Sequence, residues 1–177
     1  MPLDLYLWFD KPSNGAKEIE GESQDKDLRE KERVKPIKIK SFDLGVGNKT
    51  TIGSASGGAS SGRCELKEFG ISKTTDGCAP DFFIGCATGG HYETANILLR
   101  KDGKNFIKYI FSLCFITEVS WKGSEGDEAP GEDIKFVYGA LRVEYYPQLS
   151  DGKMKGQPKI AEWNQVNNSQ TSTVTQH

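Results

Sequence analysis

The sequence contains very few of the side chains that most often carry catalysis or bind metals. Among its 177 residues there are only two histidines, His91 and His177, and four cysteines that form no Cys-x-x-Cys pair. A structural zinc site needs four such ligands converging on one point, and the spacing here indicates none. A catalytic triad needs a histidine beside its nucleophile, which leaves His91 as the only internal candidate. We therefore expect no metal site, no cofactor and no catalytic residue.

The chain also lacks an excess of positive charge and any long apolar run. It carries 23 Lys and Arg against 25 Asp and Glu, so nothing in its net charge of -2 favours nucleic acid as a partner. No stretch approaches about 20 apolar residues, so no membrane insertion is expected. The first residues have neither the basic nor the apolar region of a signal peptide. We expect synthesis in the cytoplasm, and the cysteines are expected to be buried thiols rather than disulfides.

What the chain does contain is one unusually long strand pattern, at residues 107–121. Its odd positions are seven apolar residues and one Thr: Ile107, Tyr109, Phe111, Leu113, Phe115, Thr117, Val119 and Trp121. This period of two predicts a β-strand with the odd positions against the core. The even positions include Ile110, Cys114 and Ile116 among polar residues, although the second face of an antiparallel sheet normally meets water. We expect these three side chains to face outward and contact a neighbouring subunit.

The rest of the chain predicts further strands and one helix. Strand patterns occupy residues 3–9, 37–46, 64–72, 92–101, 133–146 and 158–163, and 21–35 is a charged loop or short helix. Residues 79–88 predict a helix with Phe82, Phe83 and Cys86 on its apolar face. A Gly139-Ala140 phase change predicts a bulge. The fold class is mainly β: a small antiparallel β-barrel with one short flanking α-helix, formed by residues 1–164, with 165–177 a polar tail that we expect to be disordered.

Residues 47–62 are the only low-complexity segment of the chain. They consist largely of Gly, Ser, Ala and Thr and connect two predicted strands. A long loop of small residues within a compact domain is usually functional or disordered. The segment has no Gly-x-x-x-x-Gly-Lys-Ser/Thr pattern, so a phosphate-binding loop is excluded.

Two other function classes remain open on the residues alone. In a monomeric barrel that binds a small ligand, the inner face of 107–121 would line a cavity. A cysteine or carboxylate hydrolase would require Cys86, His91 or an acid pair, but the pairs Asp127/Glu128 and Glu132/Asp133 fall in a stretch that we interpret as a solvated polar loop.

An ordered set of short motifs, spread from Asp4 to about Asn164, resembles the Hcp family, the tube protein of the type VI secretion system. The motifs that carry the resemblance are Gly21 to Asp25, Ile37 to Phe42, Gly45-Val46, Gly57-Gly58, Gly62-Arg63, Lys73 and Asp76, Cys86 to Gly89 with His91, Glu144 to Gln148, Asp151-Gly152, and Trp163-Asn164.

The resemblance implies a β-barrel that assembles into hexameric rings, which stack into a hollow tube. It implies further partners in the spike protein at the tube tip, the sheath, and effector proteins carried in the lumen. It also implies export from the bacterial cytoplasm by the type VI system, without a signal peptide. In the family, the long loop after the second strand reaches an adjacent subunit or ring. Carried onto this chain, that loop contains Thr50, Thr51, Ile52 and Ser54, which we expect to contribute to the ring or stacking interface.

Overall fold

The computed structural model describes residues 2–52, 59–60 and 62–174. About half of them lie in strands. In chain order the elements are β1 (Leu3–Ser13), α1 (Lys26–Glu30), β2 (Ile37–Lys38), β3 (Ser41–Asp43), β4 (Val46–Asn48), β5 (Thr51–Ile52), β6 (Ala59–Ser60), β7 (Cys64–Leu66), β8 (Phe69–Thr74), α2 (Ala79–Thr88), β9 (His91–Lys101), β10 (Lys104–Lys122), β11 (Gly131–Tyr145) and β12 (Lys159–Asn164).

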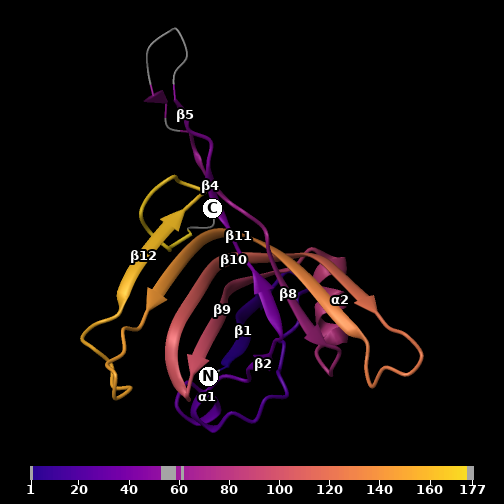
Figure 1. Ribbon diagram of the computed structural model, residues 1–177. Helices are drawn as coiled ribbons and strands as arrows, with labels where there is room; N and C mark the ends of the chain where they lie inside the picture. Colours follow the sequence, from indigo (N-terminus) through magenta and orange to yellow (C-terminus); the bar gives the residue numbers. More distant parts are fainter. Residues whose placement is uncertain (1, 53–58, 61, 175–177) are drawn as a thin grey trace.

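The main sheet is antiparallel and strongly curled. Its strands follow the order β2-β1-β9-β10-β11-β8-β3, and β12 also pairs with β11. The long strands arch over the core, while β4 and β5 lead away from it (Figure 1). This arrangement confirms the predicted fold class, a mainly β protein built on a curled antiparallel sheet.

A single short segment joins the two ends of this strand order. Only Ile39 and Lys40 separate β2, which pairs with β1, from β3, which pairs with β8. The backbone N–H of Ile39 donates to the Leu5 carbonyl at 3.1 Å, and that of Lys40 donates to the Ser72 carbonyl at 2.8 Å. The segment therefore forms hydrogen bonds with both edges of the sheet, and these bonds satisfy backbone groups that an open edge would expose.

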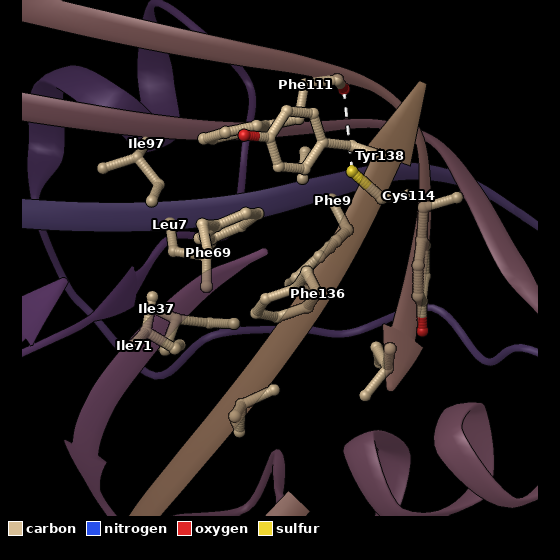
Figure 2. Packing of buried hydrophobic residues seen from close by; sticks show 14 of the residues in the cluster. Leu7, Phe9, Ile37, Phe69, Ile71, Ile97, Phe111, Cys114, Phe136 and Tyr138 are labelled. Atoms are coloured by element: carbon tan, nitrogen blue, oxygen red, sulfur yellow. Dashed lines mark hydrogen bonds between the residues drawn. The ribbon is translucent and has the colours of Figure 1, made fainter. Parts of the chain in front are cut away.

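Aromatic side chains fill the interior of the sheet. The Phe69 ring stacks between Phe111, at a centroid distance of 4.1 Å, and Phe136, at 4.6 Å. All three side chains are fully buried, and Tyr138 and Phe9 extend the cluster on either side (Figure 2). Of the residues expected to line a ligand cavity in the alternative function, Phe111 therefore packs within this aromatic cluster instead.

In each of three neighbouring strands, the alternation of core-facing and outward-facing side chains shifts by one residue, and these shifts lie along one line across the sheet. On each of β9, β10 and β11, two successive residues separate the core positions: Glu93-Thr94 between Tyr92 and Ala95, Ser112-Leu113 between Phe111 and Cys114, and Gly139-Ala140 between Tyr138 and Leu141. The register places Glu93 opposite Leu113 and Leu113 opposite Gly139, and Lys11 of β1 lies opposite Glu93. We call Lys11, Glu93, Leu113 and Gly139 the inversion line.

A left-handed backbone conformation produces the inversion on β10, where Leu113 has a φ of 57°. Lys11, at the same level of β1, is also left-handed, with a φ of 52°. Such a residue rotates the following side chain to the other face of the strand. The Gly139-Ala140 phase change predicted from the sequence is confirmed, but the opposite strand changes phase with it. The β10–β11 register is therefore continuous here, and it shifts only farther on, between Ile116 and Glu118.

The two helices cover different parts of the sheet. The charged segment predicted as a loop or short helix contains α1, whose Leu28 is buried with Tyr6, Trp8 and Leu98 in a second apolar cluster on the outer side of β1 and β9. The predicted helix at residues 79–88 is confirmed as α2, ended by Gly89 at a φ of 65°. Its Phe82 is buried in the core, whereas Phe83 is 57% exposed, so the predicted apolar face was wrong at that position.

The inversion line generates a stability prediction at Lys11. A residue with a Cβ is strained in the left-handed backbone conformation, whereas glycine is not. The free energy of unfolding of Lys11→Gly should therefore exceed that of Lys11→Ala by about 1 kcal/mol. Both variants lose the exposed ion pair with Glu93 equally, so the difference isolates the backbone effect. Urea unfolding of the two variants measures it, and equal midpoints would show that the backbone conformation at this position carries no strain.

Candidate assembly surfaces

The low-complexity segment forms the distal part of a long β-hairpin. Strand β4 pairs with β7 at its base, and β5 pairs with β6 farther out. The hairpin projects from one end of the barrel, on the side opposite α1 (Figure 1). Thr50 and Thr51 are exposed, and Ile52 is 89% exposed, whereas Ser54 lies outside the described residues. An apolar side chain held in water at the far end of a projecting hairpin is suited to a contact with another molecule.

Between its two strand pairs, the two backbone segments of the hairpin approach each other closely at a glycine. A Cβ at Gly62 would lie 2.0 Å from the Lys49 carbonyl oxygen, so no other residue fits without a backbone shift. The chain enters and leaves the distal part of the hairpin at this contact, so the distal part can be shortened without separating the two strands at its base.

The outward orientation expected for Cys114 and Ile116 is wrong. Cys114 is fully buried and Ile116 is 4% exposed, and both belong to the main core cluster. The physical reason is the left-handed conformation of Leu113, after which the even positions of β10 face the core. The Cys114 Sγ lies 3.8 Å from the Phe111 carbonyl (Figure 2), and burial raises the pKa of this thiol far above its ordinary range. Neither side chain is available to a neighbouring subunit.

The same inversion places different apolar residues on the outer face of β10 and β11. Leu113 and Phe115 are half-buried there, and Val137, opposite Phe115, is 40% exposed. The His91 ring lies 5.2 Å from the Phe115 ring on the other side. We call Leu113, Phe115 and Val137 the outer apolar patch. The odd-even pattern missed it because the pattern assumes an unbroken strand.

Ile110 lies on the other side of the inversion line, among polar groups. Its cross-strand neighbours are Asn96 on β9 and Arg142 on β11. Arg142 forms ion pairs with Glu144 and Glu162, at 2.9 and 3.5 Å. The outward orientation predicted for Ile110 agrees with its half-buried state, but it does not share one continuous apolar surface with the patch beyond Leu113.

A groove lies at the end of the barrel away from the hairpin. It has a volume of about 520 Å³ and is lined by α1, the β9–β10 turn and the chain after β11. Arg100 crosses its floor, nearly buried, and its guanidinium pairs with Asp25 at 3.0 Å and Asp27 at 3.2 Å. The neighbouring cations hold the pKa of the Asp27 carboxyl below its ordinary value, Lys31 with the larger effect and Arg100 with the smaller. These ion pairs fasten α1 to the sheet.

A buried charge cluster joins β8, β11 and the start of α2. The Lys73 Nζ is fully buried, 2.7 Å from Asp76 Oδ1 and 3.9 Å from Glu132 Oε2. Trp121 Nε1 donates to the same Glu132 carboxylate at 3.2 Å. Burial raises the pKa of Glu132, and the nearby Lys73 charge opposes that shift. Glu132 is 1% exposed within β11, so placing it in a solvated loop was wrong.

The side chains considered for catalysis are not grouped around a cleft as an active site would require. His91 is 8% exposed at the start of β9, with Asn14 Nδ2 3.5 Å from its Nδ1. Cys86 is half-buried on α2 and packs against the core. Across residues 2–52, 59–60 and 62–174 there is no group of three or more His, Cys, Asp and Glu side chains that could hold a metal ion.

None of the helices that the structure describes combines the length and the apolar content needed to cross a bilayer.

The chain is similar to known proteins in both sequence and fold. A family model described as "Type VI secretion system effector, Hcp" matches residues 6–145. The protein named Protein hcp1 of Pseudomonas aeruginosa strain PAO1 is 27% identical over 106 residues, which are 58% of this chain and 65% of that protein. The chain thus spans slightly less than two thirds of this curated relative.

Solved structures share the fold. One titled "Structure of a type six secretion system protein" superposes with a TM-score of 0.83 at 24% identity, covering 96% of this chain and all of the other. Hcp1 from Salmonella typhimurium has a TM-score of 0.71 at 22% identity, covering 97% and 100%. A type VI secretion system effector from Yersinia pestis has a TM-score of 0.68 at 21% identity, covering 91% and 99%.

The buried charge cluster predicts a distinctive pH dependence. A carboxyl group whose pKa is raised by folding binds its proton more tightly in the folded state, so its contribution to stability grows as the pH falls through that raised pKa toward the ordinary value of 4.5. Wild type should therefore gain free energy of unfolding relative to Glu132→Gln as the pH falls from 7 to 4.5. Urea titrations at several pH values measure the difference. The exposed Glu125→Gln serves as control, and parallel curves for wild type and Glu132→Gln would refute the raised pKa.

Proposed function

Because the chain belongs to the Hcp family of the type VI secretion system, we propose that it is a structural, non-enzymatic subunit of the secretion tube. In this function six copies form a ring, rings stack into a hollow tube, and the tube carries effector proteins. The observation that supports a structural role best is the division of the molecule into a solid barrel wall and a projecting hairpin. The wall is filled with aromatic side chains, and the hairpin carries an exposed apolar residue, Ile52.

The two kinds of surface suit two kinds of contact. The outer apolar patch lies on rigid, paired strands, which is suited to fixed side-by-side packing within a ring. The hairpin projects away from the barrel, and a projecting hairpin is suited to reaching an adjacent subunit or ring. Thr50, Thr51, Ile52 and Ser54 remain our candidates for that contact, and Ile110 remains a candidate for the ring contact. Leu113, Phe115 and Val137 take the place of Cys114 and Ile116.

The remaining partners follow from the same proposal. A tube of this kind requires a spike protein at its tip and a surrounding sheath, and export would use the type VI system itself. These partners would be recognised by assembled rings rather than by a pocket in one subunit, since the interior of each barrel is packed.

The first prediction concerns assembly and the hairpin. At micromolar concentration, light scattering should give a mass about six times the chain mass of 19.5 kDa, and micrographs should show rings and short stacks. Removing residues 50–60 and rejoining the strands at the Lys49–Gly62 contact should preserve the ring but reduce stacking. Wild type and an Ala substitution of the exposed Lys101, away from the hairpin, are the controls. A clean wild-type monomer would refute the tube subunit and favour a monomeric binding protein.

The second prediction concerns the ring contact. Val137→Asp should weaken ring formation about tenfold or more, because a charge desolvated at an interface is costly. Val137→Thr keeps the shape of the side chain without charge and should retain rings. Thermal unfolding must stay unchanged in both variants, in contrast to Ile116→Asp, which should unfold the core. If Val137→Asp retains full rings while Ile110→Asp loses them, the contact lies on the Ile110 side of the inversion line.

A further inference from the structure

The chain after β12 connects the barrel to the base of the hairpin. The backbone N–H of Gln165 donates to the Gly139 carbonyl of β11 at 2.9 Å. Its side-chain Oε1 accepts from the backbone N–H of Leu66 in β7 at 2.6 Å. Its carbonyl accepts from the Arg63 guanidinium, just before β7, at 2.9 Å. One residue therefore bonds to the inversion line of the wall with one group and to the hairpin with two others.

The position of Leu66 explains why a side chain is needed at this point. The next backbone N–H, of Lys67, donates across the hairpin to the Gly45 carbonyl at 3.0 Å. Because successive N–H groups in a strand point to opposite sides, the Leu66 N–H lies on the other edge of β7. An unpaired N–H at a partly buried strand edge is unfavourable. The Gln165 amide oxygen occupies the position that a further strand would take.

Asn164 holds the segment that presents Gln165. Its side chain is fully buried, and its Oδ1 accepts from the backbone N–H groups of Val166 and Asn167 at 2.9 and 3.2 Å. Its Nδ2 donates to the Thr173 carbonyl at 2.7 Å, and its backbone exchanges two hydrogen bonds with Ser169. Residues 165–174 are thereby folded into a closed loop.

The closed loop also rests against the inversion line. Val166 and Val174 both lie close to Gly139, where an added Cβ would be 3.2 Å from a methyl of each. Because Gly139 has no side chain, it leaves space beside β11, and the two valines occupy that space. The segment expected to be a disordered tail thus has defined contacts with the barrel over its described part, 165–174. Figure 1 shows β12 running toward the base of the hairpin, which places this loop between the two.

We propose that residues 165–174 are a strut that sets the direction of the projecting hairpin, with Gln165 as its positioning residue. The base of the hairpin is anchored in the core by Leu66, and the strut adds hydrogen bonds on the other edge of β7. An isolated two-stranded hairpin is only marginally stable in water, so this added support restricts its direction. A hairpin held in one direction loses less conformational freedom when it docks, which strengthens docking without adding a contact. The consequence for ring stacking rests on the proposed function of the hairpin, whereas the strut itself does not.

The experiment compares three substitutions in the full chain. Gln165→Ala removes the acceptor for Leu66, and Gln165→Glu keeps an acceptor oxygen at the same distance along the side chain. Gln170→Ala, the matched control, removes an exposed Gln of the same loop, whose side chain makes no hydrogen bond to any described residue. Hydrogen exchange measured on single amides reads the strut directly. Gln165→Ala should increase exchange of the Leu66 amide about fivefold, the effect of one lost hydrogen bond, while the other two variants should leave it unchanged.

A second readout tests the consequence for assembly. In Gln165→Ala the thermal midpoint should fall by no more than about 2–4 °C, the effect of one lost hydrogen bond in a domain of this size, and the ring mass should match wild type. The average stack length in micrographs should fall, and Gln165→Glu should restore it. A general structural defect would lower the midpoint further or reduce the ring mass, and that outcome would overturn the positioning role.

Two different failures can be told apart. If Leu66 exchange and stacking both remain at wild-type values in Gln165→Ala, the strut is refuted. If Leu66 exchange rises but neither Gln165→Ala nor removal of residues 50–60 changes stacking, the strut is supported and the proposed stacking role of the hairpin fails.

Discussion

The alternation of inward and outward side chains across the sheet is the constraint on which the rest of the molecule depends. Here the phase changes on neighbouring strands along one line, so the cross-strand pairs directly on either side of that line stay in register. Leu113 faces Glu93 on one side and Gly139 on the other. If one strand changed phase alone, a row of apolar side chains would move into water and a row of polar ones into the core.

The inversion determines which residues are available to other molecules. On one side of the line, the outer faces of β1 and β9 are covered by α1, which is fastened by the Arg100 ion pairs. On the other side, Phe115 and Val137 lie on the outer face with only partial cover, next to Leu113 of the line itself. The line also carries Gly139, whose missing side chain provides the place where the segment after β12 rests. A core requirement and two surface features therefore follow from the same row of residues.

Much of the fold could be predicted from the sequence because most strands are short and alternate cleanly. The main strand segments along the chain, the helix at 79–88 and the phase change at Gly139 were readable from local patterns, since Gly and Pro mark turns directly. The orientation of Cys114 and Ile116 could not be predicted, because a Leu residue gives no signal in the sequence that its backbone is left-handed. The strands on either side of Leu113 change phase at the same level, at positions 20 and 26 residues away in the chain, so a local pattern does not contain this information. The contact of Gln165 with Leu66 spans 99 positions and leaves no local signal at either end.

The wall and the hairpin differ in the physical basis of their contacts, and this difference bears on how a tube could form. The outer apolar patch is presented by paired strands packed on a stacked aromatic core, so its shape changes little on docking and its affinity depends on fit. The hairpin is supported mainly at its base, so its affinity depends on how narrowly its direction is restricted before docking. A ring contact would then tolerate few substitutions, whereas a stacking contact could be adjusted from outside its own surface, through residues such as Gln165. Changing the loop that holds the hairpin would tune stacking while leaving the ring and the barrel core as they are.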